Sequence, residues 1–168
     1  MLTKFEFLTL VECEMNIISH LVGKLKPQHL AFRLTPAQRS TQELIEFLAV
    51  QLVGGVSYFI TDSWDAWTAG SKQAAGITPA AFPAAIAAQL AEVRRLLAPL
   101  SESEFATRMT KHPSGTPAHM PLPEALLTCS LGWIYGYKMQ LFLQAKAAGI
   151  ADIGSSNLWM GMDQAAKA

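Results

Sequence analysis

The sequence has few charged residues, only two cysteines and no net charge, and each shortage excludes a class of protein. Asp, Glu, Lys and Arg make up 15% of the 168 residues, and 13 basic side chains balance 13 acidic ones. No segment gathers enough cations to neutralise a row of phosphates, so nucleic acid is not an expected partner. Cys13 and Cys129 lie far apart and outside any C-x-x-C motif. We therefore expect no disulfide framework or zinc knuckle, and two reduced, buried thiols.

The sequence also shows neither a typical secretory signal nor a predicted membrane span. Glu6, Glu12 and Glu14 interrupt the apolar N-terminal segment, which is not typical of a secretory signal. The uncharged stretch 125–137 is about half of the roughly 20 residues that span a bilayer, and it carries two glycines. The sequence predicts a cytoplasmic protein with no membrane contact.

What the sequence does contain is four segments with helical signals. Apolar residues recur every three or four positions, Ser40 and Glu43 form a capping box, and Gly149 is a typical helix stop. The expected helices are 4–25, 41–60, about 79–98 and about 122–148. The fourth is apolar on most of its circumference and is expected to be the most central. With no convincing strand signal, the pattern predicts an all-α, antiparallel four-helix bundle in a single domain, 1–168.

The segments between these helices are less regular. Residues 61–77 mix polar residues with Trp64 and Trp67 and are predicted to form a long surface connection, with or without a helical turn. The two tryptophans are expected either to plug the end of the bundle or to belong to a partner surface. Residues 101–104 form a second capping box, which opens one short turn. Residues 107–121 contain three prolines and are predicted to be a loop.

Two segments and the tail carry a family resemblance. They are 39–49, RSTQELIEFLA, and 133–140, WIYGYKMQ, followed by Asn-Leu-Trp at 157–159. They resemble the DinB-like (YfiT-like) superfamily of small four-helix proteins, which includes metal-dependent thiol transferases and maleylpyruvate isomerases. The resemblance implies a DinB-like four-helix bundle, in up-down-down-up order, with a long crossover between helices 2 and 3.

The chain departs from that superfamily at the metal ligands. In active members one histidine on helix two and two on helix four, the latter in the pattern H-x-x-x-H-R-x-Q, hold a divalent metal. The matching positions here are Phe47, Trp133 and Tyr137. Phe and Trp offer no lone pair, and a phenol must lose a proton at a pKa of about 10 before it becomes a good ligand. We therefore expect no metal and no cofactor, and an aromatic cluster in place of the metal site.

The same positions define a candidate pocket. Helical spacing places Trp133, Tyr137 and Gln140 on one stripe, and Phe47 and Gln51 of the second helix complete the set. In one interpretation the aromatic rings simply fill the space of a former metal site. In the other they line an apolar pocket, with the Tyr137 hydroxyl, the Trp133 indole N–H and the Gln140 amide as polar groups.

Glycines and histidines allow further alternatives. Glycines at 54, 55, 132 and 136 lower helix propensity, which indicates either close helix approach or room for a ligand beside Trp133. His112 and His119 share one predicted loop and could supply a relocated metal site, although their spacing is not typical of metal ligands. A nucleophilic cysteine would need a nearby base or cation, and both thiols lie in apolar helical runs.

Three functions remain open. The first is a non-catalytic or metal-independent DinB-like protein that binds a small apolar molecule or a protein partner. The second is a thiol-transferase-like enzyme that works without the histidine triad, and the third is a metalloprotein that uses loop histidines. We also expect a homodimer, because the first helix has apolar residues beyond its inner stripe. These are Phe7, Leu10, Ile17 and Leu21, which the segment 61–77 or the tail with Leu158 and Trp159 could cover instead.

Overall fold

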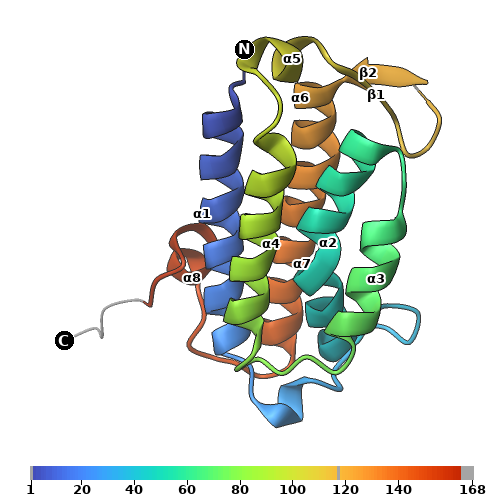
Figure 1. The fold of residues 1–168 in the computed structure, drawn as a ribbon. Coiled ribbons are helices and arrows are strands. Elements are labelled where there is room, and N and C mark those ends of the chain that lie inside the picture. Colours follow the sequence, from blue (N-terminus) through green and yellow to red (C-terminus); the bar gives the residue numbers. More distant parts are fainter. Residues whose placement is uncertain (1, 117, 164–168) are drawn as a thin grey trace.

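Four long helices form the bundle in the computed structural model, which describes residues 2–116 and 118–163 (Figure 1). They are α1 (Lys4–Gly23), α2 (Thr41–Thr61), α4 (Phe82–Leu97) and α7 (Gly132–Ala147). In Figure 1, α1 and α7 run downward, whereas α2 and α4 run upward. The four predicted helices and their up-down-down-up order are confirmed. The boundaries of the first three agree to within about one turn, and the fourth predicted helix corresponds to α7 together with the helical turns that precede it from Leu122.

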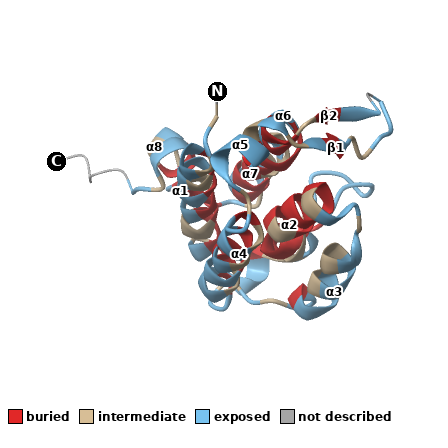
Figure 2. Ribbon diagram, turned by 45° about the horizontal axis from the view of Figure 1, so that its top comes forward, coloured by how far each residue is buried: buried red, intermediate tan, exposed pale blue. Residues whose placement is uncertain are grey.

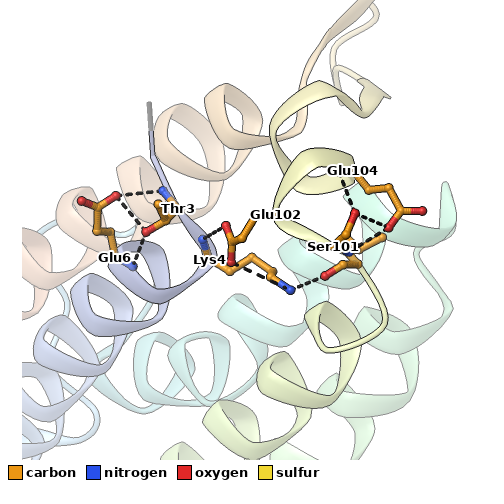
Figure 3. A network of polar contacts seen from close by, with 7 residues as sticks. Thr3, Lys4, Glu6, Ser101, Glu102 and Glu104 are labelled. Carbon is orange, nitrogen blue, oxygen red and sulfur yellow. Dashed lines mark hydrogen bonds and ion pairs between the residues drawn. The ribbon is translucent and has the colours of Figure 1, made fainter.

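Side-chain caps start three of the helices, and two of these caps, at Ser40 and Ser101, are the capping boxes that the sequence indicates. The Ser40 amide donates to Glu43 Oε2 at 2.6 Å, and the Glu43 amide donates to Ser40 Oγ at 3.2 Å. Figure 3 shows equivalent boxes at the start of α1 and of the short helix α5 (Glu102–Thr107). The Lys4 amide also donates to Glu102 Oε2 at 3.2 Å, which ties the start of α1 to α5.

Two connections contain more structure than the sequence predicts. The crossover between α2 and α4 holds a ten-residue helix, α3 (Asp65–Ala74), which packs along α2. The long crossover is as predicted, but it holds a full helix rather than a single turn. The sequence did not indicate this helix because α3 has a polar outer face and only Ala74 of its residues is buried. The loop predicted over 107–121 contains a small antiparallel hairpin, β1 (Met109–Lys111) and β2 (His119–Pro121). Strands of three residues are too short to give an alternating pattern.

The chain reaches α7 through a continuous helical segment with an irregular middle. It begins with α6 (Leu122–Ala125), continues as the π-helical turns of η2 (Leu126–Leu131), and becomes regular at Gly132. Wider π turns interrupt the usual hydrogen-bond ladder and often occur at functional sites. Gly149 adopts φ +98° just after α7, which confirms it as the left-handed stop.

The most central helix is α2, not the fourth helix of the bundle as expected (Figure 2). Fourteen of the 21 residues of α2 are buried, against 13 of the 26 residues from Leu122 to Ala147, which make up α6, η2 and α7. By length and composition α2 could cross a membrane, but 72% of its most apolar 18-residue window is buried inside the bundle. Its apolar character is explained by contacts with α3, α4, η2 and α7 on several sides.

The last helix, α8 (Ser155–Met160), packs against α1. Three of the four residues that we expected to be surplus on α1, namely Phe7, Ile17 and Leu21, are buried within the chain, and Leu10 is 38% exposed. The homodimer stays a prediction, but this apolar surplus no longer supports it. Cys13 on α1 is exposed, contrary to expectation, whereas Cys129 is buried as predicted.

Candidate functional site: an aromatic groove

A groove of about 350 Å³ lies between α2, α3 and α7. Five aromatic side chains line it: Phe47 from α2, Trp64 and Trp67 from the start of α3, and Trp133 and Tyr137 from α7. None of the five is fully buried, and Trp64 is 39% exposed. We call this feature the aromatic groove.

The rings of the aromatic groove support one another. Phe47 meets the Trp67 ring nearly edge-on at 5.1 Å between centroids and lies 4.3 Å from the Tyr137 ring. Trp67 is in turn perpendicular to Trp64 at 5.9 Å, and Trp64 stacks on Tyr58 of α2 at 4.3 Å. Edge-to-face and offset contacts of this kind are favourable. The walls are therefore held in place without a ligand.

Two glycines of α2 allow the neighbouring elements to come close. A Cβ atom on Gly54 would lie 2.4 Å from Cε3 of Trp67, and one on Gly55 would lie 3.1 Å from Oγ of Ser130. Close approach explains both glycines. It does not explain Gly136 of α7, because a Cβ atom there would meet nothing within 4 Å.

Arg39, just before the cap of α2, lies over the groove wall. Its guanidinium carbon is 4.4 Å from the centroid of the Phe47 ring and 5.6 Å from that of Tyr137. A guanidinium on a ring face is stabilised by the ring quadrupole. The arrangement places a positive charge beside an otherwise apolar surface.

The structure brings together only some of the residues predicted for the pocket. Phe47, Trp133 and Tyr137 all line the groove, whereas Gln51 and Gln140 are not among its lining residues. Gln51 is fully buried, and its Nε2 donates to the Ser130 carbonyl at 3.2 Å. Gln140 is partly buried. The candidate pocket is therefore an aromatic groove whose polar neighbour is Arg39 rather than the predicted glutamines.

Three groove residues were missed at the sequence level. Trp64 and Trp67 were expected at the end of the bundle or on a partner surface, but α3 lays them along α2. Arg39 was part of the segment that resembles the family, yet no spacing rule places it over the ring of a residue two turns later. Gly54 is a signal that could have found Trp67, because it leaves room on α2 for a large side chain to lie against the helix.

A contact between a cysteine and a histidine joins η2 to the loop of the hairpin. Sγ of Cys129, in η2, is 3.6 Å from Nε2 of His112. Nδ1 of His112 accepts the Ser114 amide proton at 3.2 Å and also lies 2.7 Å from Oγ of Ser114, so contacts on both sides of the ring hold the imidazole beside the sulfur. His119 is exposed on β2, and within 2–116 and 118–163 no three His, Cys, Asp or Glu residues group as metal ligands.

The opposite side of α7 carries a buried ion pair. Nζ of Lys138 lies 2.5 Å from Oε2 of Glu14 on α1, with side-chain exposures of 2% and 13%. The Lys138 ammonium is also 5.0 Å from the ring centroid of Trp159 in α8 and 5.5 Å from that of Tyr135. Burial raises the pKa of Tyr135, and the nearby charge of Glu14 adds to this effect.

Comparison with known proteins agrees with this architecture. No protein-family model matches the sequence, and no curated protein matches it significantly. Among solved structures, the fold is similar to that of a DinB family member protein from Shewanella denitrificans, with a TM-score of 0.56 and 15% identity. The match covers 96% of this chain and 93% of that one. The chain has an all-α, DinB-like fold, as the sequence predicts.

Proposed function

We propose that this DinB-like protein binds a small apolar molecule in the aromatic groove and does so without a metal. The observation that carries the proposal is that five large aromatic side chains surround about 350 Å³ of space and none is fully buried. Ligand sites commonly have volumes of roughly 300–1,000 Å³ and mainly apolar, aromatic walls. Rings that served only to fill a core would be more completely covered.

The chemistry of the walls supports a metal-independent site. Phe47, Trp133 and Tyr137 stand at the positions that, by the family resemblance, would hold the metal-binding histidines. Neither Phe nor Trp offers a lone pair in the plane where a metal ligand is needed, and a neutral phenol is a poor ligand. What the groove offers is flat apolar surface, which suits a ring or a short hydrocarbon chain. A cytoplasmic location remains part of this proposal.

Intrinsic fluorescence gives a direct test, because three of the four tryptophans line the groove. Titration with the neutral probe N-phenylnaphthylamine should produce saturable quenching with one site per chain. Trp133→Ala should weaken binding several-fold by removing one wall. Trp159→Ala is the matched control, since Trp159 is 59% exposed on α8 and does not line the groove. Equal affinities of the two variants would contradict the proposal.

A second candidate is an enzyme that works without the histidine triad, and the Cys129–His112 contact favours it. The imidazole 3.6 Å from the Cys129 sulfur is the kind of partner that a cysteine nucleophile needs. The candidate predicts that Cys129, although only 5% exposed, reacts with a thiol reagent faster than the exposed Cys13. Comparing Cys13→Ser with Cys129→Ser in such a reaction measures the two rates separately. A slower Cys129 would leave the binding protein as the better description.

A further inference from the structure

We infer that the ligand of the aromatic groove is a flat apolar molecule with an acidic group, and that Arg39 binds this group. The inference rests on the proposed function, because it names the class of molecule that the groove binds. Its basis is a single unpaired cation that the fold holds over two of the five groove walls. The occupant that complements an apolar wall with one positive charge is an aromatic or alicyclic carboxylate.

The backbone of Arg39 is fixed by α7. The side chain of Gln144 is fully buried in α7, and its Nε2 lies 3.2 Å from the carbonyl oxygen of Arg39. The same nitrogen is 3.0 Å from the Phe32 carbonyl and 3.1 Å from Oγ1 of Thr41. The segment before α2 is thus attached to the helix that carries Trp133 and Tyr137. Arg39 therefore starts from a defined position beside the groove.

The guanidinium of Arg39 differs from the other arginines in having no polar partner. Across the described part of the chain it makes no ion pair and no side-chain hydrogen bond. The other four arginines all have partners: Arg33 pairs with Glu43, Arg94 with Glu12, Arg95 with Glu92, and Arg108 donates to the Ile60 carbonyl. The acidic residues at this end of α2 are also engaged, because Glu43 caps the helix and Glu46 accepts from Gln42 and the Gly76 amide.

The N–H groups of Arg39 are available to a ligand, because the residue is exposed and its side chain has no polar partner in the described part of the chain. When a guanidinium stacks on a ring with its flat surface, its N–H groups point outward in its own plane. Those N–H groups match the two oxygens of a carboxylate, and pairing of this kind is stronger than a neutral hydrogen bond. The ligand would place its apolar body against Phe47 and Tyr137 and its acidic group on Arg39. Both contacts are made within one short molecule.

The test compares two probes of the same shape, naphthoate and naphthamide, by calorimetric titration at low salt. Wild-type protein should bind naphthoate about fivefold more tightly than naphthamide, the upper range for an exposed ion pair. Arg39→Gln should abolish this preference while changing naphthamide affinity less than about twofold. Arg33→Gln is the matched control, because Arg33 is an exposed arginine of the same connector that already has a partner. It should retain the preference.

The outcomes separate the inference from the proposed function. Equal affinity of the two probes for wild type, or a preference that survives Arg39→Gln, would overturn the inference and leave the apolar groove in place. If neither probe bound, the proposed function would fail together with the inference. The same would follow if Trp133→Ala bound both probes as tightly as the wild-type protein does. A preference that falls as salt is raised and disappears in Arg39→Gln would support the ion pair.

Discussion

The two sides of α7 are built in opposite ways. On the side that faces α2 and α3, aromatic rings line a groove and remain partly exposed. On the side that faces α1 and α8, Lys138 and Glu14 form an ion pair that is almost completely enclosed. The usual preference would place charges outside and rings inside. The enclosed pair joins helices, whereas the exposed rings leave apolar surface that folding alone does not require.

The difference shows which side is closed by the chain itself. The tail returns as α8 and places Trp159 over the Lys138 ammonium, so the charged side has an intramolecular cover. The segment that could have covered the aromatic side, α3, instead contributes Trp64 and Trp67 to the walls of the groove. The aromatic side therefore keeps an open groove of about 350 Å³.

The largest expected effect comes from breaking the ion pair on the enclosed side. Lys138→Met leaves Glu14 buried without its cation, and removal of one partner of a buried pair typically costs about 3–5 kcal/mol of unfolding free energy. The double variant Lys138→Met with Glu14→Leu should recover most of this loss, because no buried charge is left uncompensated. Urea denaturation measures both. A loss below about 1 kcal/mol in the single variant would mean that water reaches the pair.

The next effect concerns the close contact of α3 with α2. Gly54→Ala places a methyl group 2.4 Å from the Trp67 ring position, so the tryptophan or α3 must move. Overpacking of this kind typically costs about 1–3 kcal/mol, and the displaced wall should weaken probe binding in the groove.

Gly136→Ala is the matched control for Gly54→Ala. Its Cβ atom meets nothing within 4 Å, and alanine has the higher helix propensity. It should therefore stabilise the protein by up to about 1 kcal/mol without changing probe binding. If Gly54→Ala stabilised the protein as much as Gly136→Ala, α3 could not lie as close to α2 as described.

Most of the bundle could be predicted from local signals. Capping boxes, apolar spacing and Gly149 act over a few residues, so the four long helices were found with nearly correct boundaries. The short hairpin and α3 could not be found in this way. Each depends on contacts with distant segments, such as the hydrogen bond from Thr110 Oγ1 to the Phe59 carbonyl.

The site was predictable only where it lies on regular helices. Phe47, Trp133 and Tyr137 converge as the family resemblance implies, because α2 and α7 are long and their register fixes which residues face each other. Arg39 and the contact of His112 with Cys129 depend on how a connector and a hairpin fold back. The spacing of residues in the sequence does not show how these two segments fold back.

The stability lost when Trp133 is truncated depends on how open the aromatic side is. Complete burial of a tryptophan would make Trp133→Ala cost about 3–5 kcal/mol, but Trp133 is only partly buried. We expect a loss of about 1–2 kcal/mol in urea denaturation. Phe105→Ala is a reference for full burial, because Phe105 is completely enclosed, and should cost about 3–5 kcal/mol. Equal losses would show that the rings fill a closed core.

The smallest effect concerns Asp163, which attaches the end of the described chain to α1. Its carboxylate pairs with Lys24, lies 3.6 Å from Nε2 of His20 and accepts from Nδ2 of Asn157 at 2.9 Å. The hydrogen bond from Lys24 lowers the pKa of Asp163, and the charges of Lys24 and His20 add to this. Because the folded pKa is below the unfolded value of about 3.9, the contribution to stability is complete above that value and is lost as the pH falls through the folded pKa.

Asp163→Asn isolates this contribution, since it removes the titrating group and leaves a side chain of similar size. Wild type should be slightly more stable than the variant at about pH 5, and the difference should disappear as the pH falls well below about 4. Urea denaturation of both proteins across this range measures the difference directly. Other capping carboxylates titrate in the same range in both proteins, so their effect cancels in the comparison. A difference that does not change with pH would show that Asp163 makes no ionic contact with α1.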